Sequence, residues 1–208
     1  MTPISLLSAM NRFSALLALL PPPGLSAAVV LSGPTSILIP NDFDGVYLDL
    51  DTGATSAGEF TGWDVNLAFG GSEIYVNDSF QPVRVGTGNL DAVVNLSPGA
   101  VVGSGSTFAG TAFGGSLNHL GPDLGQFQNG SEGFIGFAFM TNATPGPITG
   151  PHYGWLRVTL TSGSTTGTIN GWAYESAAGT SIAVPEPSAC AVLAGLAALG
   201  LARKRRRR

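Results

Sequence analysis

Short apolar or alternating runs recur through the middle of the chain, between about Ala28 and Val184, and Gly, Asn, Asp or Pro residues separate them. No run in this region keeps the 3.6-residue period of a helix. The pattern predicts about eleven short strands, near residues 36–39, 46–51, 64–69, 73–76, 83–85, 92–96, 107–113, 133–140, 153–160, 168–174 and 181–184. Short strands joined by turns predict an all-β fold, an antiparallel β-sandwich or jelly roll.

The strongest alternation is YGWLRVTL at residues 153–160. It predicts a strand with aliphatic side chains toward the core and two aromatic rings and an arginine on the other face. Either a neighbouring strand or loop covers the rings and a carboxylate pairs with the arginine, or the rings form a sugar-binding surface. The second interpretation gives a possible ligand platform of Tyr153, Trp155, Arg157, Trp172 and Tyr174.

An apolar segment, FSALLALL at residues 13–20, precedes this body and is followed by three prolines. Small residues then stand at Ser26, Ala27 and Ala28, as at a signal-peptidase site. The segment predicts a signal helix within residues 1–27, removed by cleavage after Ala27 or Ala28. Met10 is an alternative start to Met1, because the residues before Met10 add nothing that a signal peptide needs.

The segment 185–208 has three parts in a fixed order. Pro185 and Pro187 bracket Glu186 and favour an extended, accessible backbone. Residues 189–202 are apolar and uncharged and predict a single transmembrane helix of roughly 21 Å. A basic cluster follows and would stop the helix on the cytoplasmic side of the membrane: Arg203, Lys204, Arg205, Arg206, Arg207 and Arg208.

This tail resembles the PEP-CTERM sorting signal, with Val184, Pro185, Glu186 and Pro187 as its sorting motif. The resemblance implies partners, namely the export machinery and a membrane-embedded transpeptidase of the exosortase family. It also implies a transient anchor in the inner membrane, cleavage near Pro-Glu-Pro, and a final place in the cell envelope, on the outer surface or outside the cell. The body resembles a type that recurs among such proteins and has no assigned chemistry, through FAF 137–139, HYGW 152–155 and GWAYE 171–175.

Charge is distributed unevenly along the chain. The whole sequence has nine Lys plus Arg and thirteen Asp plus Glu, a net charge of −4. Once both predicted ends are set aside, Arg84 and Arg157 remain against twelve acids, a net charge of about −10. Such a body does not suit nucleic acid, which is a polyanion. The one cysteine, Cys190, lies in the tail, so the body holds neither a disulfide nor a thiolate metal site.

Five oxygen-bearing side chains lie between Asn41 and Asp51. Calcium prefers six to eight hard oxygen ligands, so this stretch is a possible calcium site. It departs from the EF-hand loop, because Pro40 would fall at the first ligand position. A solvated turn and strand end is the competing interpretation. The possible metal ligands are Asp42, Asp44, Asp49 and Asp51.

Catalytic motifs are scarce in the sequence. His119 and His152 lie far apart and outside any metalloprotease pattern, and Ser116 in GGSLN lacks the last glycine of a nucleophile elbow. We therefore expect a non-catalytic structural or interaction body of an exported bacterial surface or matrix protein. A carbohydrate-binding module acting on extracellular polysaccharide is the first alternative, and a secreted hydrolase with a spatial carboxylate pair is the second.

Overall fold

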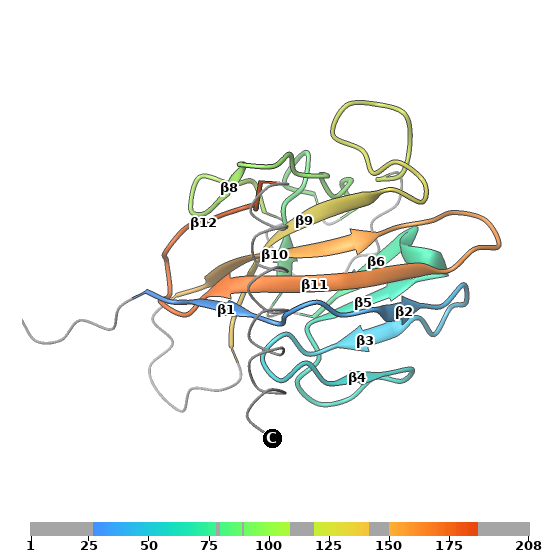
Figure 1. Cartoon of the computed structure of the whole chain (residues 1–208), viewed down its shortest axis with the longest axis horizontal. Coiled ribbons are helices and arrows are strands. Elements are labelled where there is room, and N and C mark those ends of the chain that lie inside the picture. Colours follow the sequence, from blue (N-terminus) through green and yellow to red (C-terminus); the bar gives the residue numbers. More distant parts are fainter. Residues whose placement is uncertain (1–26, 78–79, 89, 109–118, 142–149, 187–208) are drawn as a thin grey trace, which may run out of the picture.

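The computed structural model describes residues 27–77, 80–88, 90–108, 119–141 and 150–186 (Figure 1). The predicted signal helix up to residue 26, the apolar helix and basic cluster of the tail, and most of the strand expected at 107–113 lie outside these residues. Within the described ranges, no helix is long and apolar enough to cross a membrane.

The described residues form antiparallel sheets, as the pattern predicted. A six-stranded sheet has the order β1-β11-β10-β9-β7, with β2 also on β11, and a four-stranded sheet has the order β4-β3-β5-β6. A two-stranded sheet joins β8 and β12. The strands of the large sheet are β1 (Val29–Leu31), β2 (Ile37–Ile39), β7 (Phe80–Pro82), β9 (Glu132–Phe139), β10 (His152–Thr159) and β11 (Gly167–Glu175). The others are β3 (Val46–Leu48), β4 (Thr55–Ser56), β5 (Val65–Ala68), β6 (Glu73–Val76), β8 (Val101–Val102) and β12 (Ile182–Ala183), and one 3₁₀ turn, η1 (Phe69–Gly71), follows β5.

Most predicted strands have a counterpart, and the three longest, β9, β10 and β11, match the strongest sequence patterns. The segments expected at 83–85 and 92–96 form only isolated bridges, such as Arg84 with Val93. The pattern missed β1, β4, β7 and β8, all of two or three residues, because so short a run shows no clear alternation.

The main core lies between the six-stranded and the four-stranded sheet. The buried cluster takes Leu156, Val158 and Ile169 from the first sheet and Leu48 and Leu67 from the second. A hydrogen bond of 3.0 Å from Trp172 Nε1 to the Leu50 carbonyl also joins the two sheets. The sheet side chains that point toward each other therefore form the common core.

Gly154 explains the middle residue of the YGW pattern. It shares the core face of β10 with Leu156, and it pairs with Phe137 on one side and with Tyr174 on the other. A Cβ atom at this position would overlap the Phe137 ring and the carbonyl oxygen of Ala173. Glycine therefore makes room on the core face for a large ring of the neighbouring strand.

A second buried cluster covers part of the opposite face of the six-stranded sheet. It joins Phe134, Ala138 and Tyr153 of that sheet with Val102 of β8 and Ile182 of β12. Figure 1 shows β8 and β12 at the upper left, beyond β9 and β10. The six-stranded sheet therefore has an inner face, toward the second sheet, and an outer face, covered by the β8–β12 pair and by loops.

Candidate functional site

The rings of β10 lie on the outer face and have aromatic neighbours. Tyr153 is buried and stacks on Phe108, with ring centroids 5.9 Å apart and an interplanar angle of 15°. Trp155 is partly buried and meets Phe134 edge to face, with centroids 5.7 Å apart. The structure therefore supports the first interpretation of these rings, in which neighbouring segments pack against them.

Trp172 and Tyr174 do not belong to this surface, which corrects the five-residue platform. In the antiparallel register, Trp172 pairs with Leu156 and Tyr174 pairs with Gly154. Residues that lie directly opposite in a sheet point to the same side, so both rings lie on the inner face, in the main core. The five residues are divided between two faces and cannot contact one ligand together.

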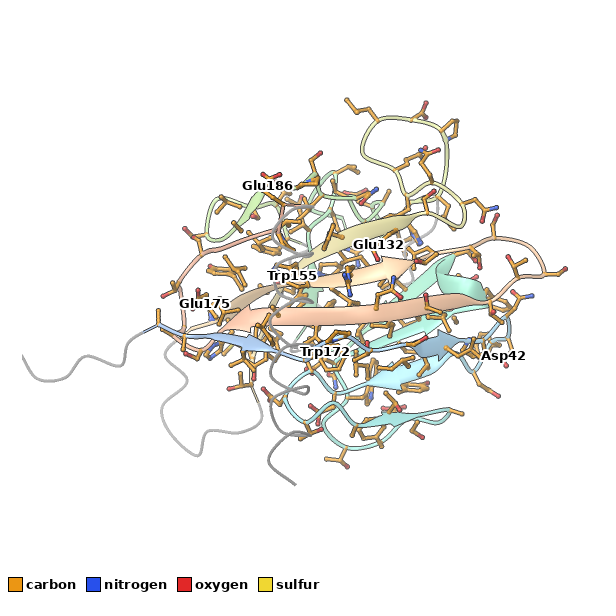
Figure 2. The ribbon with its side chains drawn as sticks, in the orientation of Figure 1. Asp42, Glu132, Trp155, Trp172, Glu175 and Glu186 are labelled. Atoms are coloured by element: carbon orange, nitrogen blue, oxygen red, sulfur yellow. The ribbon has the colours of Figure 1, made fainter. Side chains whose placement is uncertain are left out.

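Arg157 lies on the outer face and is half-buried. Its Nη2 donates a hydrogen bond of 2.9 Å to the Asn170 carbonyl, and its Nε lies 3.8 Å from a carboxylate oxygen of Glu132 at the start of β9. Figure 2 shows Glu132 and Trp155 over this central part of the sheet. The expected carboxylate partner is thus present, but Glu132 is about half exposed, and water screens the pair.

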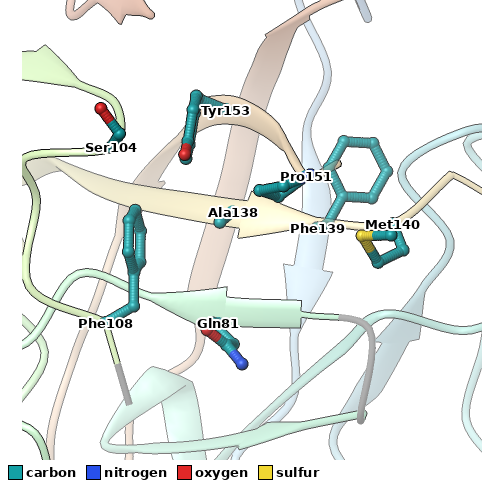
Figure 3. Close-up of a pocket in the computed structure, with 8 residues that line it drawn as sticks. All are labelled: Gln81, Ser104, Phe108, Ala138, Phe139, Met140, Pro151 and Tyr153. Atoms are coloured by element: carbon teal, nitrogen blue, oxygen red, sulfur yellow. The ribbon is translucent and has the colours of Figure 1, made fainter. Parts of the chain in front are cut away.

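A cleft opens beside Tyr153 (Figure 3). Its volume is about 330 Å³, near the lower end of the range for small-molecule sites. Aromatic and aliphatic groups form most of its wall, and the polar atoms come from side chains on three separate segments. The lining residues are Gln81, Ser104, Phe108, Ala138, Phe139, Met140, Pro151 and Tyr153.

The outer face of the four-stranded sheet carries aromatic residues that sequence reasoning did not select. Tyr47 of β3 and Trp63 meet edge to face at 5.0 Å, and Tyr75 of β6 lies 6.4 Å from the exposed ring of Phe43. A hydrogen bond to Glu73, together with burial, raises the pKa of Tyr75 to about 12. The alternation in EIYV, residues 73–76, is the sequence pattern that could have placed Tyr75 away from the core.

The predicted calcium ligands do not converge, which corrects that hypothesis. Asp42 and Asp44 precede β3, whereas Asp49 and Asp51 follow it, and an extended strand separates its two ends by about 3.3 Å per residue. Asp42 accepts the Gly45 N–H at 2.9 Å, as in a turn. Among the residues that the structure describes, no group of three or more His, Cys, Asp or Glu side chains could hold a metal ion.

The remaining acids of this region have structural contacts. Asp49 accepts the backbone N–H groups of Asp51 and Thr52 at 2.8 and 3.0 Å, and buried Asp64 accepts that of Leu50 at 2.8 Å. The phenol of Tyr174, on the inner face, donates a hydrogen bond of 3.3 Å to Asp51 Oδ1, and burial, followed by the charge of Asp51, raises its pKa to about 12. These carboxylates stabilise the loop after β3.

The four glutamates of the body before the tail are distributed over separate places. Glu59 accepts a hydrogen bond of 3.2 Å from Trp63 Nε1, Glu73 accepts one from Tyr75, and Glu132 faces Arg157. Glu175, at the end of β11, is buried, and its Oε2 has no hydrogen-bond partner among the described residues. Each glutamate thus has a different environment, and no two of them contact each other.

The segment that leads into the tail is held by the body. Val184 follows β12 directly, is buried, donates a hydrogen bond of 2.8 Å to the Ala100 carbonyl and accepts one of 2.9 Å from the Gly99 N–H. Pro185 is partly buried and Glu186 is exposed. The chain therefore passes from a hydrogen-bonded, buried residue to an exposed residue within two positions.

Residues 183–207 match the family model of the PEP-CTERM protein-sorting motif. The PEP-CTERM motif implies that the protein is exported, processed by an exosortase and sorted to the cell surface. The match begins at Ala183, the last residue of β12. No curated protein and no solved structure is similar enough to this chain to count as a match.

Proposed function

We propose that this chain is a surface or extracellular-matrix protein whose β body has a non-catalytic structural or interaction role. The PEP-CTERM motif carries the first half of the proposal, because sorting by an exosortase delivers a protein to the cell surface. The contacts of the body's acids support the second half. Asp49, Asp64 and Glu59 accept hydrogen bonds from neighbouring groups, which is a structural use of a carboxylate.

The two ends of the exported protein provide the direct test. We expect mass spectrometry of protein from the envelope and the medium to find a chain that ends near Glu186 and lacks the six basic residues 203–208. A variant with Pro185→Ala and Pro187→Ala should accumulate unprocessed in the inner membrane, and Pro98→Ala, a loop proline outside the motif, is the matched control. Recovery of the basic peptide on most of the extracellular wild-type protein would contradict the proposal.

Carbohydrate binding is the second candidate, and the cleft beside Tyr153 favours it. A stacked pair of rings lies there beside the polar side chains of Gln81 and Ser104. Aromatic rings suit the C–H faces of sugars, and amide and hydroxyl groups suit their hydroxyls. The secreted hydrolase stays a third hypothesis, and the separate contacts of the four glutamates before the tail give it no support.

Affinity electrophoresis in gels that contain a neutral polysaccharide can separate these candidates. If the cleft binds sugar, Phe108→Ala should weaken the interaction by about tenfold, equivalent to 1.4 kcal/mol. Phe43→Ala is the matched control, because that ring is exposed on the other sheet. Loss of binding in Phe43→Ala alone would place the site on the aromatic face of the four-stranded sheet. If the gel does not retard even the wild-type protein, the structural role is the remaining candidate.

A further inference from the structure

Glu175 is a buried carboxylate, and the His152 ring lies close by, with its Nδ1 2.7 Å from the Glu175 carbonyl oxygen. Only 9% of the residue is exposed, and its Oε2 has no hydrogen-bond partner among the described residues. The two arginines of the body are engaged elsewhere, Arg84 with the Asp91 carbonyl and Arg157 with Asn170 and Glu132. A buried carboxylate without a charged partner costs several kcal/mol, so its position favours a cation, and among the described residues none is hydrogen-bonded to its Oε2.

The beginning of β1 lies directly beside Glu175. Val29 is paired with Glu175 across the β1–β11 ladder, so the two side chains are close neighbours on one face. Ala28, one residue earlier, donates its N–H to Ser176 Oγ at 3.1 Å and accepts the Ser176 N–H at 2.9 Å. In Figure 2, Glu175 lies at the end of β11 where β1 begins. The nitrogen of Ala28 is thus bonded to the residue that follows Glu175 in the chain.

We propose that export cleaves the peptide bond between Ala27 and Ala28, and that the new α-ammonium group of Ala28 binds at Glu175 and Ser176. This inference rests on the proposed export of the protein. In the cleavage step, a signal peptidase adds one water molecule across the amide. Ala27 leaves with a carboxylate and Ala28 keeps an amine, which takes up a proton at neutral pH because free α-amino groups have a pKa near 7.7–8.0. One of its three N–H groups continues the bond to Ser176 Oγ, and the others reach the Glu175 carboxylate.

The contacts of Ala28 decide between the two cleavage positions that the sequence allows. Cleavage after Ala28 would remove the carbonyl that accepts the Ser176 N–H and would leave β1 to begin at the new terminus. Cleavage after Ala27 keeps that bond and replaces a neutral amide with a cation beside the buried carboxylate. Both alanines are exposed, so a peptidase can reach the bond between them.

The composition of the body makes this ammonium group selectively addressable. The only lysine of the whole sequence is Lys204, which is in the tail that exosortase processing removes. The exported body therefore has one primary amine, its own N-terminus. An amine-selective acetylating reagent converts that single group into a neutral amide and leaves every side-chain cation unchanged.

The experiment uses protein purified from the envelope of an exporting host. N-terminal sequencing should give Ala-Val-Val-Leu, that is, a chain that starts at Ala28. Acetylation of this protein, checked by mass, should lower its Tm by more than about 4 °C, because the carboxylate loses its partner. Glu175→Gln should lower the Tm before acetylation and respond little to it. Glu132→Gln, which removes a half-exposed carboxylate of the same sheet, should respond like the wild type.

The outcomes separate this inference from the function on which it rests. Protein that stays inside the cell with residues 1–27 attached would overturn the proposed function. Exported protein that starts at any residue other than Ala28 overturns only the inference. An exported chain that starts at Ala28 but keeps its Tm on acetylation also overturns it, and this last measurement needs no variant that could fail to fold.

Discussion

The inner and outer faces of the six-stranded sheet differ in how completely their side chains are buried. On the inner face of β10, Leu156 and Val158 are fully buried against the second sheet. On the outer face of the same strand, Trp155 and Arg157 are partly covered by loops and by their neighbours in the sheet. The difference shows that one strand serves two purposes, since one face provides most of the stability and the other presents polar and aromatic groups.

The largest expected effect concerns the inner face. Leu156→Ala should cost about 2–5 kcal/mol of unfolding free energy, because the cavity would form where the two sheets meet. Chemical denaturation of the purified body measures this loss directly. Trp155→Ala removes a larger side chain from the outer face and should cost less than Leu156→Ala. If Trp155→Ala cost more, the outer face would be the main source of stability and the comparison would fail.

Gly154 tests how tightly the inner face is packed. Gly154→Ala should destabilise the body by about 1–3 kcal/mol, because the added methyl group would overlap the Phe137 ring and a backbone carbonyl. The midpoint of urea unfolding is a suitable readout. Gly58→Ala is the control, since no atom lies within 4 Å of a Cβ placed there. Equal midpoints for the two variants would show that the inner face can accommodate an added methyl group at residue 154.

Arg157 gives the corresponding test of the outer face. A fully buried carboxylate partner would make Arg157→Met cost a few kcal/mol. The partner Glu132 is half exposed, and the bond to the Asn170 carbonyl is a single one, so we expect a loss of about 1 kcal/mol. In thermal melts at high salt, the stability loss of Arg157→Met should decrease only by the part that the ion pair with Glu132 contributes. A cost above about 3 kcal/mol would mean that Arg157 is a core residue.

The smallest effect is spectroscopic and separates the two sheets. Tyr174 is on the inner face of the large sheet, Tyr75 is on the outer face of the small one, and the pKa of each is raised to about 12. Because the folded-state pKa exceeds the usual value of about 10, the neutral phenols stabilise the fold below about pH 10. That contribution is lost as the pH rises from about 10 toward 12. Alkaline titration of the phenolate absorbance should show two late groups, and Tyr174→Phe should remove one. If the absorbance change at high pH is the same in Tyr174→Phe as in the wild type, the pKa of the Tyr174 phenol is not raised.

The sequence predicted the two faces of β10 correctly because the side chains of a strand alternate strictly. It could not say which residue of β11 lies opposite which residue of β10, because register depends on contacts between distant segments. Trp172 was therefore assigned to a surface that it does not share with Trp155. In the structure it pairs with Leu156, and its indole donates to the Leu50 carbonyl across the core.

The acidic stretch fails as a site for a related reason. Asp42 and Asp51 are near in sequence, but β3 lies between them and holds them apart. Proximity along the chain predicts proximity in space for a loop and not across a strand. The tail is the opposite case, because the PEP-CTERM motif is recognised from the order of its residues and needs no contact between distant segments.

The short strand β12 also has a mechanical role. The chain leaves the body through β12, whose two residues pair only with Val101 and Val102, and Val184 adds two further backbone hydrogen bonds. Among the described residues, these few bonds are the ones nearest to the tail, so a pull on the tail would act on them first. Ile182 and Val184 can thus detach as a unit while the main core stays closed. The body would in this way supply extra length to a membrane enzyme acting on the tail, at the cost of exposing two side chains.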